Sequence, residues 1–220
     1  MKRIKLRDRK MPAYTHGEEI MNMVTHIVGG GVGLVTLALC LIRSNSAAGV
    51  ICSLIYGVSM ICLYAMSSIY HGLRQSMGKR VMQVLDHCTI YFLIAGTYTP
   101  IAILALRPAF PVIGWGLVIF QWALTALAVT LTAIDLKKFT VFSMICYIGM
   151  GWAVIFFLPQ TLAVLGNAGF GWLLSGGIAY TLGSILYGIG SKKPWFHSVF
   201  HIFVLLGSVL QMICIIFYVF

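Results

Sequence analysis

Acidic residues are scarce in this sequence: only five of its 220 residues are Asp or Glu, against fifteen that are Lys or Arg. Charged residues of both signs make up 9% of the chain, far below the roughly 25% of an average soluble domain. A chain this poor in charge is not an ordinary soluble protein. Its 60% hydrophobic content and mean hydropathy of +0.96 indicate an integral membrane protein instead.

The cysteines are few, and their spacing shows no pairing. Six are spread along the chain without a Cys-x-x-Cys motif, which argues against a thiolate metal cluster and against a disulfide framework. The net charge of +10 would suit nucleic acid, but the basic residues flank apolar runs and form no soluble basic face. We therefore expect no nucleic-acid partner, and attribute the charge to the anionic inner leaflet of a membrane.

Long apolar runs fill most of the chain. A run of about 20 apolar residues can cross a bilayer, and in lipid such a run must be helical. Seven runs are present, near residues 20–42, 48–71, 84–106, 111–134, 139–160, 165–190 and 195–219. The first is of full spanning length and lacks a cleavage site after it, so we expect it to be kept. Residues 1–220 are thus predicted to form a single domain, an all-α seven-transmembrane helix bundle with a basic cytoplasmic tail at 1–17.

The basic residues are distributed unevenly between the two sides of this predicted bundle. The first ten residues and the links after the second, fourth and sixth runs hold thirteen Lys or Arg, whereas the remaining links hold only Arg43 and Arg107. This bias predicts a cytoplasmic N-terminus and a C-terminus outside. The expected location is the plasma (inner) membrane, crossed several times.

Two acids near the cytoplasmic side have different explanations. Glu18 closes the pattern Thr15-His16-Gly17-Glu18, which matches the T-x-x-E capping box at the start of a helix. Asp86 lies just inside the third run and has no such structural explanation, although a carboxylate in the apolar zone costs a few kcal/mol. Asp86 is therefore a candidate functional residue.

Three histidines are predicted to meet at the same depth. His197 and His201 are four residues apart and project from one helix face, so they can bind one ion together. His71, at the cytoplasmic end of the second run, can supply a third nitrogen, and Ser67 lies one turn before it. Three histidines with the fourth position open are typical of catalytic zinc. Packing is the alternative for each histidine alone, because polar groups in membranes often pair with one another.

Three further polar residues lie near this predicted cluster. His87 points about 100° away from Asp86 around the helix, so we do not expect it to be a ligand. Asn22 and His26 share one face of the first run at a similar depth. They are expected either to support the ligands from behind or simply to pack between helices.

The sequence closely resembles the hemolysin III family, the bacterial branch of the progestin and adipoQ receptor family that includes adiponectin receptors. The resemblance covers essentially the whole chain and is carried by SSIYHGL (67–73), LDHCTIYFLIAGTYTPI (85–101), HSVFH (197–201) and GEEIMNMVTH (17–26). It implies a zinc ion bound by His71, His197 and His201. It also implies that Asp86 reaches the ion through a water and that Ser67 is the family's serine.

These residues suit hydrolysis of a lipid. Zinc lowers the pKa of its bound water toward about 7, and Asp86 is placed to orient that water and accept its proton as general base. Ser67 would stabilise an oxyanion or steady a ligand. Our leading hypothesis is a zinc-dependent hydrolase of a lipid amide or ester at the inner leaflet, similar to the related alkaline ceramidases.

Other functions stay open at this point. One is a receptor-like or regulatory membrane protein in which zinc is structural and a lipid or signal shifts the bundle. Another is the membrane-perturbing hemolysin that the family name implies, against which the absence of a secretion signal argues. The small number of intramembrane charges argues against an ion transporter.

Overall fold

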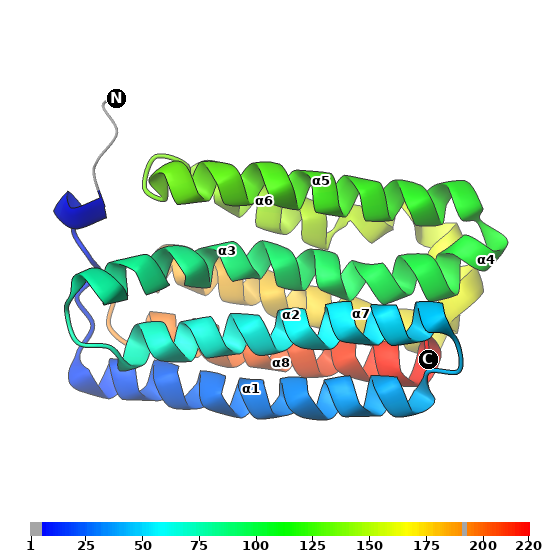
Figure 1. The fold of residues 1–220 in the computed structure, drawn as a ribbon, viewed down its shortest axis with the longest axis horizontal. Coiled ribbons are helices and arrows are strands. Elements are labelled where there is room, and N and C mark those ends of the chain that lie inside the picture. The colour runs from blue at the N-terminus through cyan, green and yellow to red at the C-terminus, as the bar shows by residue number, and fades with distance from the viewer. Residues whose placement is uncertain (1–5, 191–192) are drawn as a thin grey trace.

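The computed structural model describes residues 6–190 and 193–220, and within them every regular element is a helix. Residues 1–5 of the predicted basic tail and Lys192 lie outside the described residues. In chain order the elements are η1 (Leu6–Asp8), α1 (His16–Arg43), α2 (Ala47–Gly72), α3 (Met77–Pro100), η2 (Ile101–Leu106), α4 (Arg107–Ala109), α5 (Pro111–Asp135), α6 (Thr140–Gly151), η3 (Ala153–Phe157), α7 (Leu158–Gly190) and α8 (Phe196–Tyr218). The long helices lie side by side, with the two chain termini at opposite ends of the bundle (Figure 1).

Six helical stretches of the described chain are long and apolar enough to cross a membrane. One of them, Thr140–Ile189, is 50 residues long and covers both the fifth and the sixth predicted run. Gly166 interrupts it with φ 65° and ψ 174°, a conformation that glycine adopts far more readily than other residues. The all-helical membrane fold is confirmed, and the count of seven spans stays a prediction.

The third helix begins earlier than the apolar run predicts. The Ser76 side chain accepts a hydrogen bond from the Lys79 N–H (3.1 Å), so α3 starts at Met77 and not near residue 84. Its first two turns contain Lys79, Arg80 and Gln83, which hide the start from a search for apolar runs. Asp86 and His87 therefore lie in the third turn of α3 and do not open it.

The GxxxG pattern of α1 marks a close approach to α2. A Cβ built on Gly29 would overlap the ring of Tyr64, and one on Gly33 would lie 3.2 Å from the backbone nitrogen of Ile61. Small residues at such positions let helix backbones approach closely in lipid. This contact brings the start of α1 and the end of α2 together, where the polar residues lie.

We expect Gly29→Ala to destabilise the fold by roughly 1–3 kcal/mol, because the added methyl overlaps a packed ring. Tyr64 has little room to move, since it is fully buried and its hydroxyl donates to Ser208 Oγ at 2.6 Å. The fraction of detergent-purified protein that stays monodisperse after heating measures the effect. Gly31→Ala is the matched control, because nothing lies within 4 Å of a Cβ there. Equal losses in both variants would contradict this packing.

Candidate metal centre

The three histidines predicted as ligands come together at one end of the bundle. His71 lies in the last turn of α2, and His197 and His201 lie in the first two turns of α8. One ring nitrogen of each lies within 4.8 Å of the others, and all three residues are buried. The Nε2 atoms of His197 and His201 are 3.0 Å apart.

The nitrogens of this cluster fit a bound cation. Two imidazole Nε2 atoms so close need a proton or a cation between them, because facing lone pairs repel. Two nitrogens bound to one tetrahedral zinc at about 2.0–2.1 Å would lie roughly 3.4 Å apart, near the separation found here. Within the described chain, His71 Nε2 has no hydrogen-bond partner. Three neutral imidazoles are a donor set that zinc and several other transition metals accept.

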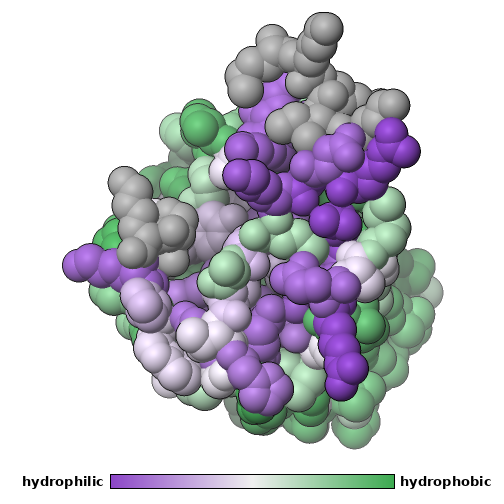
Figure 2. Space-filling model, turned by 90° about the vertical axis from the view of Figure 1, so that its left-hand side faces the viewer, coloured by the Kyte–Doolittle hydropathy of each residue, from purple (hydrophilic) through white to green (hydrophobic). Residues whose placement is uncertain are grey.

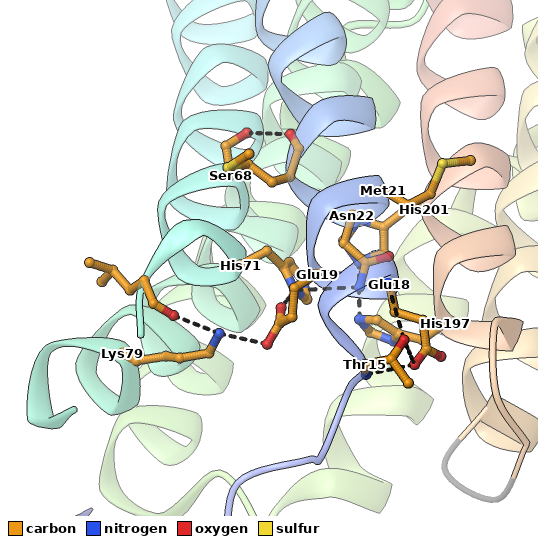
Figure 3. A network of polar contacts seen from close by, with 12 residues as sticks. Thr15, Glu18, Glu19, Met21, Asn22, Ser68, His71, Lys79, His197 and His201 are labelled. Carbon is orange, nitrogen blue, oxygen red and sulfur yellow. Dashed lines mark hydrogen bonds and ion pairs between the residues drawn. The ribbon is translucent and has the colours of Figure 1, made fainter. Parts of the chain in front are cut away.

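Glu19 holds the ring of His71 from the other side. Its Oε2 lies 2.6 Å from His71 Nδ1, and its Oε1 accepts a hydrogen bond from Lys79 Nζ at 2.6 Å (Figure 3). Because an ionised carboxylate only accepts, His71 Nδ1 carries the proton, and a neutral ring then keeps its lone pair on Nε2. This is the tautomer that a metal ligand needs, and a carboxylate behind the ring is its usual partner.

Glu19 was missed in the sequence, where it was only an acid at the start of an apolar run. The available signal was the spacing of Glu19, Asn22 and His26, which puts all three on one helix face. The Asn22 amide nitrogen lies 3.4 Å from His71 Nδ1, and the His26 ring packs on His201 with centroids 3.9 Å apart. Asn22 and His26 thus lie directly beside the ligand histidines.

A cavity of about 140 Å³ reaches the cluster from inside the bundle. Its polar end is lined by His26, Ser67, Asp86, His87, His197 and His201. Mostly apolar side chains of α3, α6, α7 and α8 line the rest. A smaller cavity of about 20 Å³ shares Thr97 and Gln211 with it and extends it further from the histidines. Between Asp86 and Thr97, α3 rises roughly 16 Å, so the space is long and narrow.

Asp86 and Ser67 face this cavity beside the histidines. Ser67 is buried one turn before His71, and its side chain faces the carboxyl group of Asp86. Asp86 is half-buried and lines the cavity. His87 shares the lining but is outside the group of histidines that can hold an ion. The cavity thus offers a carboxyl group and a neighbouring hydroxyl next to three imidazoles.

The N-terminal segment lies across the outer end of the cluster. Tyr14 stacks on His197 with ring centroids 4.7 Å apart, and burial raises the pKa of the Tyr14 hydroxyl well above its usual range. Arg9 is buried, donates to the carbonyl of Ile134 at 3.2 Å and lies 3.9 Å from the carboxylate of Asp135. Hydrophilic side chains gather on this end of the molecule (Figure 2). None of these contacts was evident from the sequence.

A bundle of apolar helices with a buried histidine cluster and an internal cavity defines a multi-pass integral membrane protein with a candidate metal centre. The chain belongs to the Haemolysin-III related family, whose match spans residues 14–212. In bacteria such a protein lies in the plasma membrane, as predicted.

Three relatives show how far the similarity extends. The chain is 36% identical to Hemolysin-3 of Bacillus cereus over 205 residues, which cover 92% of each protein. It is 36% identical to the Hemolysin-3 homolog of Bacillus subtilis (strain 168) over 208 residues, 93% of this chain and 96% of the relative. It is also 27% identical to the Monocyte to macrophage differentiation factor of Homo sapiens over 160 residues, 68% of this chain and 63% of that protein. The resemblance inferred from the sequence is thereby confirmed.

Proposed function

We propose that this protein is a zinc-dependent hydrolase that cleaves an amide or ester bond in a membrane lipid. The observation that carries the proposal is the position of the buried histidine cluster at the polar end of a mostly apolar cavity. An acyl chain would fill the apolar length, and the linkage to its headgroup would then lie beside Asp86 and Ser67. Ceramide-like amides have the required shape: a long chain ending in an amide and a small polar head.

Each polar group at the end of the cavity has a role in this chemistry. Zinc in a three-histidine site supplies a Lewis acid and lowers the pKa of water to about 7. Asp86 accepts the proton of the attacking water as general base and returns it to the leaving amine or alcohol. The Ser67 hydroxyl donates to the developing oxyanion or steadies His71 from one turn away. The apolar walls limit the access of bulk water to the reacting bond.

The proposed topology puts this site at the inner leaflet. The start of α1 and the end of α8 lie at opposite ends of the bundle, which supports an odd number of crossings (Figure 1). The 50-residue stretch Thr140–Ile189 is too long for one crossing of about 20 residues, and Gly166 divides it. These features support seven spans in one domain, and we propose that the basic N-terminal end lies in the cytoplasm against anionic lipid headgroups.

Filling the cavity is predicted to block turnover without removing metal. Gly177 lines the cavity and has open space at its Cβ, so Gly177→Leu would occupy the path of an acyl chain. We expect kcat/KM for long-chain lipids to fall by about 10-fold or more, as for lost space in an apolar substrate pocket. The assay measures fatty acid released from ceramide-type amides and phospholipid esters by the purified protein in nanodiscs.

Gly171→Leu is the matched control for this experiment. Gly171 lies on the same helix and also has open space at its Cβ, but it is not among the described residues that line the cavity. Its activity should match the wild type. Equal activities of the two leucine variants, or no release of fatty acid from either lipid class, would contradict the proposed function.

A second candidate function is that of a receptor-like or regulatory protein in which zinc is structural. It is favoured by the contacts of α1, whose Glu19 binds His71 of α2 and whose Glu18 binds the backbone of Trp195 before α8. A metal bound at the cluster would then help hold α1, α2 and α8 together, and Asp86 would not be needed for the function. A membrane-perturbing activity, suggested by the name Hemolysin-3 of two relatives, would appear as lysis of erythrocytes by the purified protein.

A further inference from the structure

We propose that Glu18 and Glu19 are positioning residues that together set the distance between the two helices carrying the metal ligands. They are neighbours in the first turn of α1, and their carboxylates reach different helices. Glu19 contacts His71 of α2 (Figure 3), and Glu18 contacts the backbone of Trp195 at the start of α8. This inference rests on the proposed metal site and adds to it the residues that hold its geometry.

We call the Glu18–Glu19 pair the clamp. Its first arm, Glu19, fixes the ring of His71. Both oxygens of Glu19 are engaged, Oε2 with His71 Nδ1 and Oε1 with Lys79 Nζ, each at 2.6 Å. Lys79 is itself buried and donates a further hydrogen bond to the carbonyl of Leu73 at 2.9 Å. The Glu19 carboxylate therefore has one defined position, and the His71 ring takes its orientation from it.

The second arm fixes the start of α8. The Trp195 N–H donates to Glu18 Oε1 at 2.6 Å, while Glu18 Oε2 accepts from the Thr15 N–H at 2.8 Å within the predicted capping box. Trp195 has φ 66°, in the left-handed region that bulky residues rarely occupy. Its indole packs over Gly17, where an added Cβ would lie 3.2 Å from the ring. These contacts hold an otherwise unfavourable backbone two residues before His197.

The Glu18 carboxylate also replaces a missing helix cap. Trp195 occupies the capping position before α8, and its side chain makes no capping hydrogen bond. A negative charge accepting from a backbone N–H there satisfies a free donor and interacts favourably with the helix dipole. The direction of the first turn of α8, which carries His197, thus depends on a residue of α1.

The packing explains why such a clamp is needed. Both α2 and α8 pack against α1. A direct polar contact between α2 and α8, from the Tyr64 hydroxyl to Ser208 Oγ, lies about two turns away from the ligand histidines. That contact joins the middle parts of the two helices, so the positions of their ligand-bearing ends depend on further contacts. The adjacent carboxylates of α1 supply two such contacts, both short and polar.

The test is the affinity of the full-length detergent-solubilised protein for Zn²⁺, measured by competition with a chromophoric chelator. We expect Glu19→Ala and Glu18→Ala each to weaken binding by about 10–100-fold, the usual effect of removing a ligand's supporting partner. Glu18→Gln keeps an acceptor for the Trp195 N–H and should bind within about threefold of the wild type. Glu19→Gln keeps an acceptor but loses the charge that makes imidazole more basic, so it should fall between.

The absorption spectrum of bound Co²⁺ separates positioning from a general loss of stability. The absorption bands should shift in Glu19→Gln and Glu19→Ala, because the ligand field that the His71 nitrogen exerts on Co²⁺ changes. Asp8→Asn removes an exposed acid at the same end of the molecule and should leave affinity and spectrum unchanged. Glu19→Ala leaves the buried Lys79 without its anionic partner and so carries a risk of misfolding. If it does not fold, the double variant Glu19→Gln/Lys79→Met, which removes both charges, takes its place.

The outcomes distinguish this inference from the proposed function. The clamp is wrong, although the metal site stands, if Glu18→Ala and Glu19→Ala both keep the wild-type Zn²⁺ affinity and an unchanged Co²⁺ spectrum. The double variant is judged in the same way if it replaces Glu19→Ala. A folded wild-type protein that binds neither Zn²⁺ nor Co²⁺ would overturn the proposed function and the clamp with it.

Discussion

The Asp86→Asn variant is expected to lose lipid hydrolysis by about 10²–10⁴-fold, the usual contribution of a general base, while it keeps its metal. Asparagine has nearly the shape of aspartate but cannot accept a proton from water at neutral pH. Asp86 lines the polar end of the cavity beside the histidines without belonging to the cluster that can hold an ion. Its loss should therefore remove the chemistry and spare the metal.

The comparison requires turnover and metal content on the same preparation. Asp8→Asn makes the same substitution at an exposed acid and should retain both. Full activity in Asp86→Asn with metal bound would remove the general base from the mechanism and favour the structural role of zinc. Loss of metal together with activity would show instead that Asp86 is a ligand or supports one.

The His197→Ala/His201→Ala double variant is expected to fall from about one zinc per chain to nearly none, since a single remaining protein ligand cannot retain the ion. The two Nε2 atoms are 3.0 Å apart and both rings are buried. Their removal leaves His71 as the single histidine of the three proposed ligands. Mass spectrometry of the detergent-purified protein gives the metal content, and size-exclusion chromatography establishes that the variant is folded.

His16→Ala is the control for this variant. His16 is an exposed histidine at the start of α1, at the same end of the bundle. It should keep the full metal content. Retention of zinc by the folded double variant would place the metal elsewhere in the chain.

Much of this architecture could be predicted from the sequence, because the signals were local. Long apolar runs predict membrane helices whatever their partners are, and the i, i+4 spacing of His197 and His201 gives them one helix face. The Thr15–Glu18 capping box was also predicted, and both of its hydrogen bonds are present. The meeting of these two histidines with His71 followed from their common depth and from the family resemblance.

The residues that were missed act across long sequence separations. Glu19 meets His71 52 positions away, and Glu18 meets Trp195 177 positions away, so no local pattern gives these pairs. Lys79 was counted as one of the basic residues that flank the membrane, yet it is 2% exposed and bound to Glu19. The start of α3 was misplaced by seven residues for a different, local reason. Its first two turns contain Lys79, Arg80 and Gln83, and apolar content alone does not reveal the Ser76 cap.

The most direct test of the central claim is lipid hydrolysis by one preparation before chelation, after chelation, and after zinc is returned. The account predicts that release of fatty acid stops when the metal is removed and returns with about one equivalent of zinc per chain, as three histidine ligands with one open position require. Turnover that survives complete removal of metal from the folded protein, or no turnover of lipid amides or esters with one zinc bound, would contradict it.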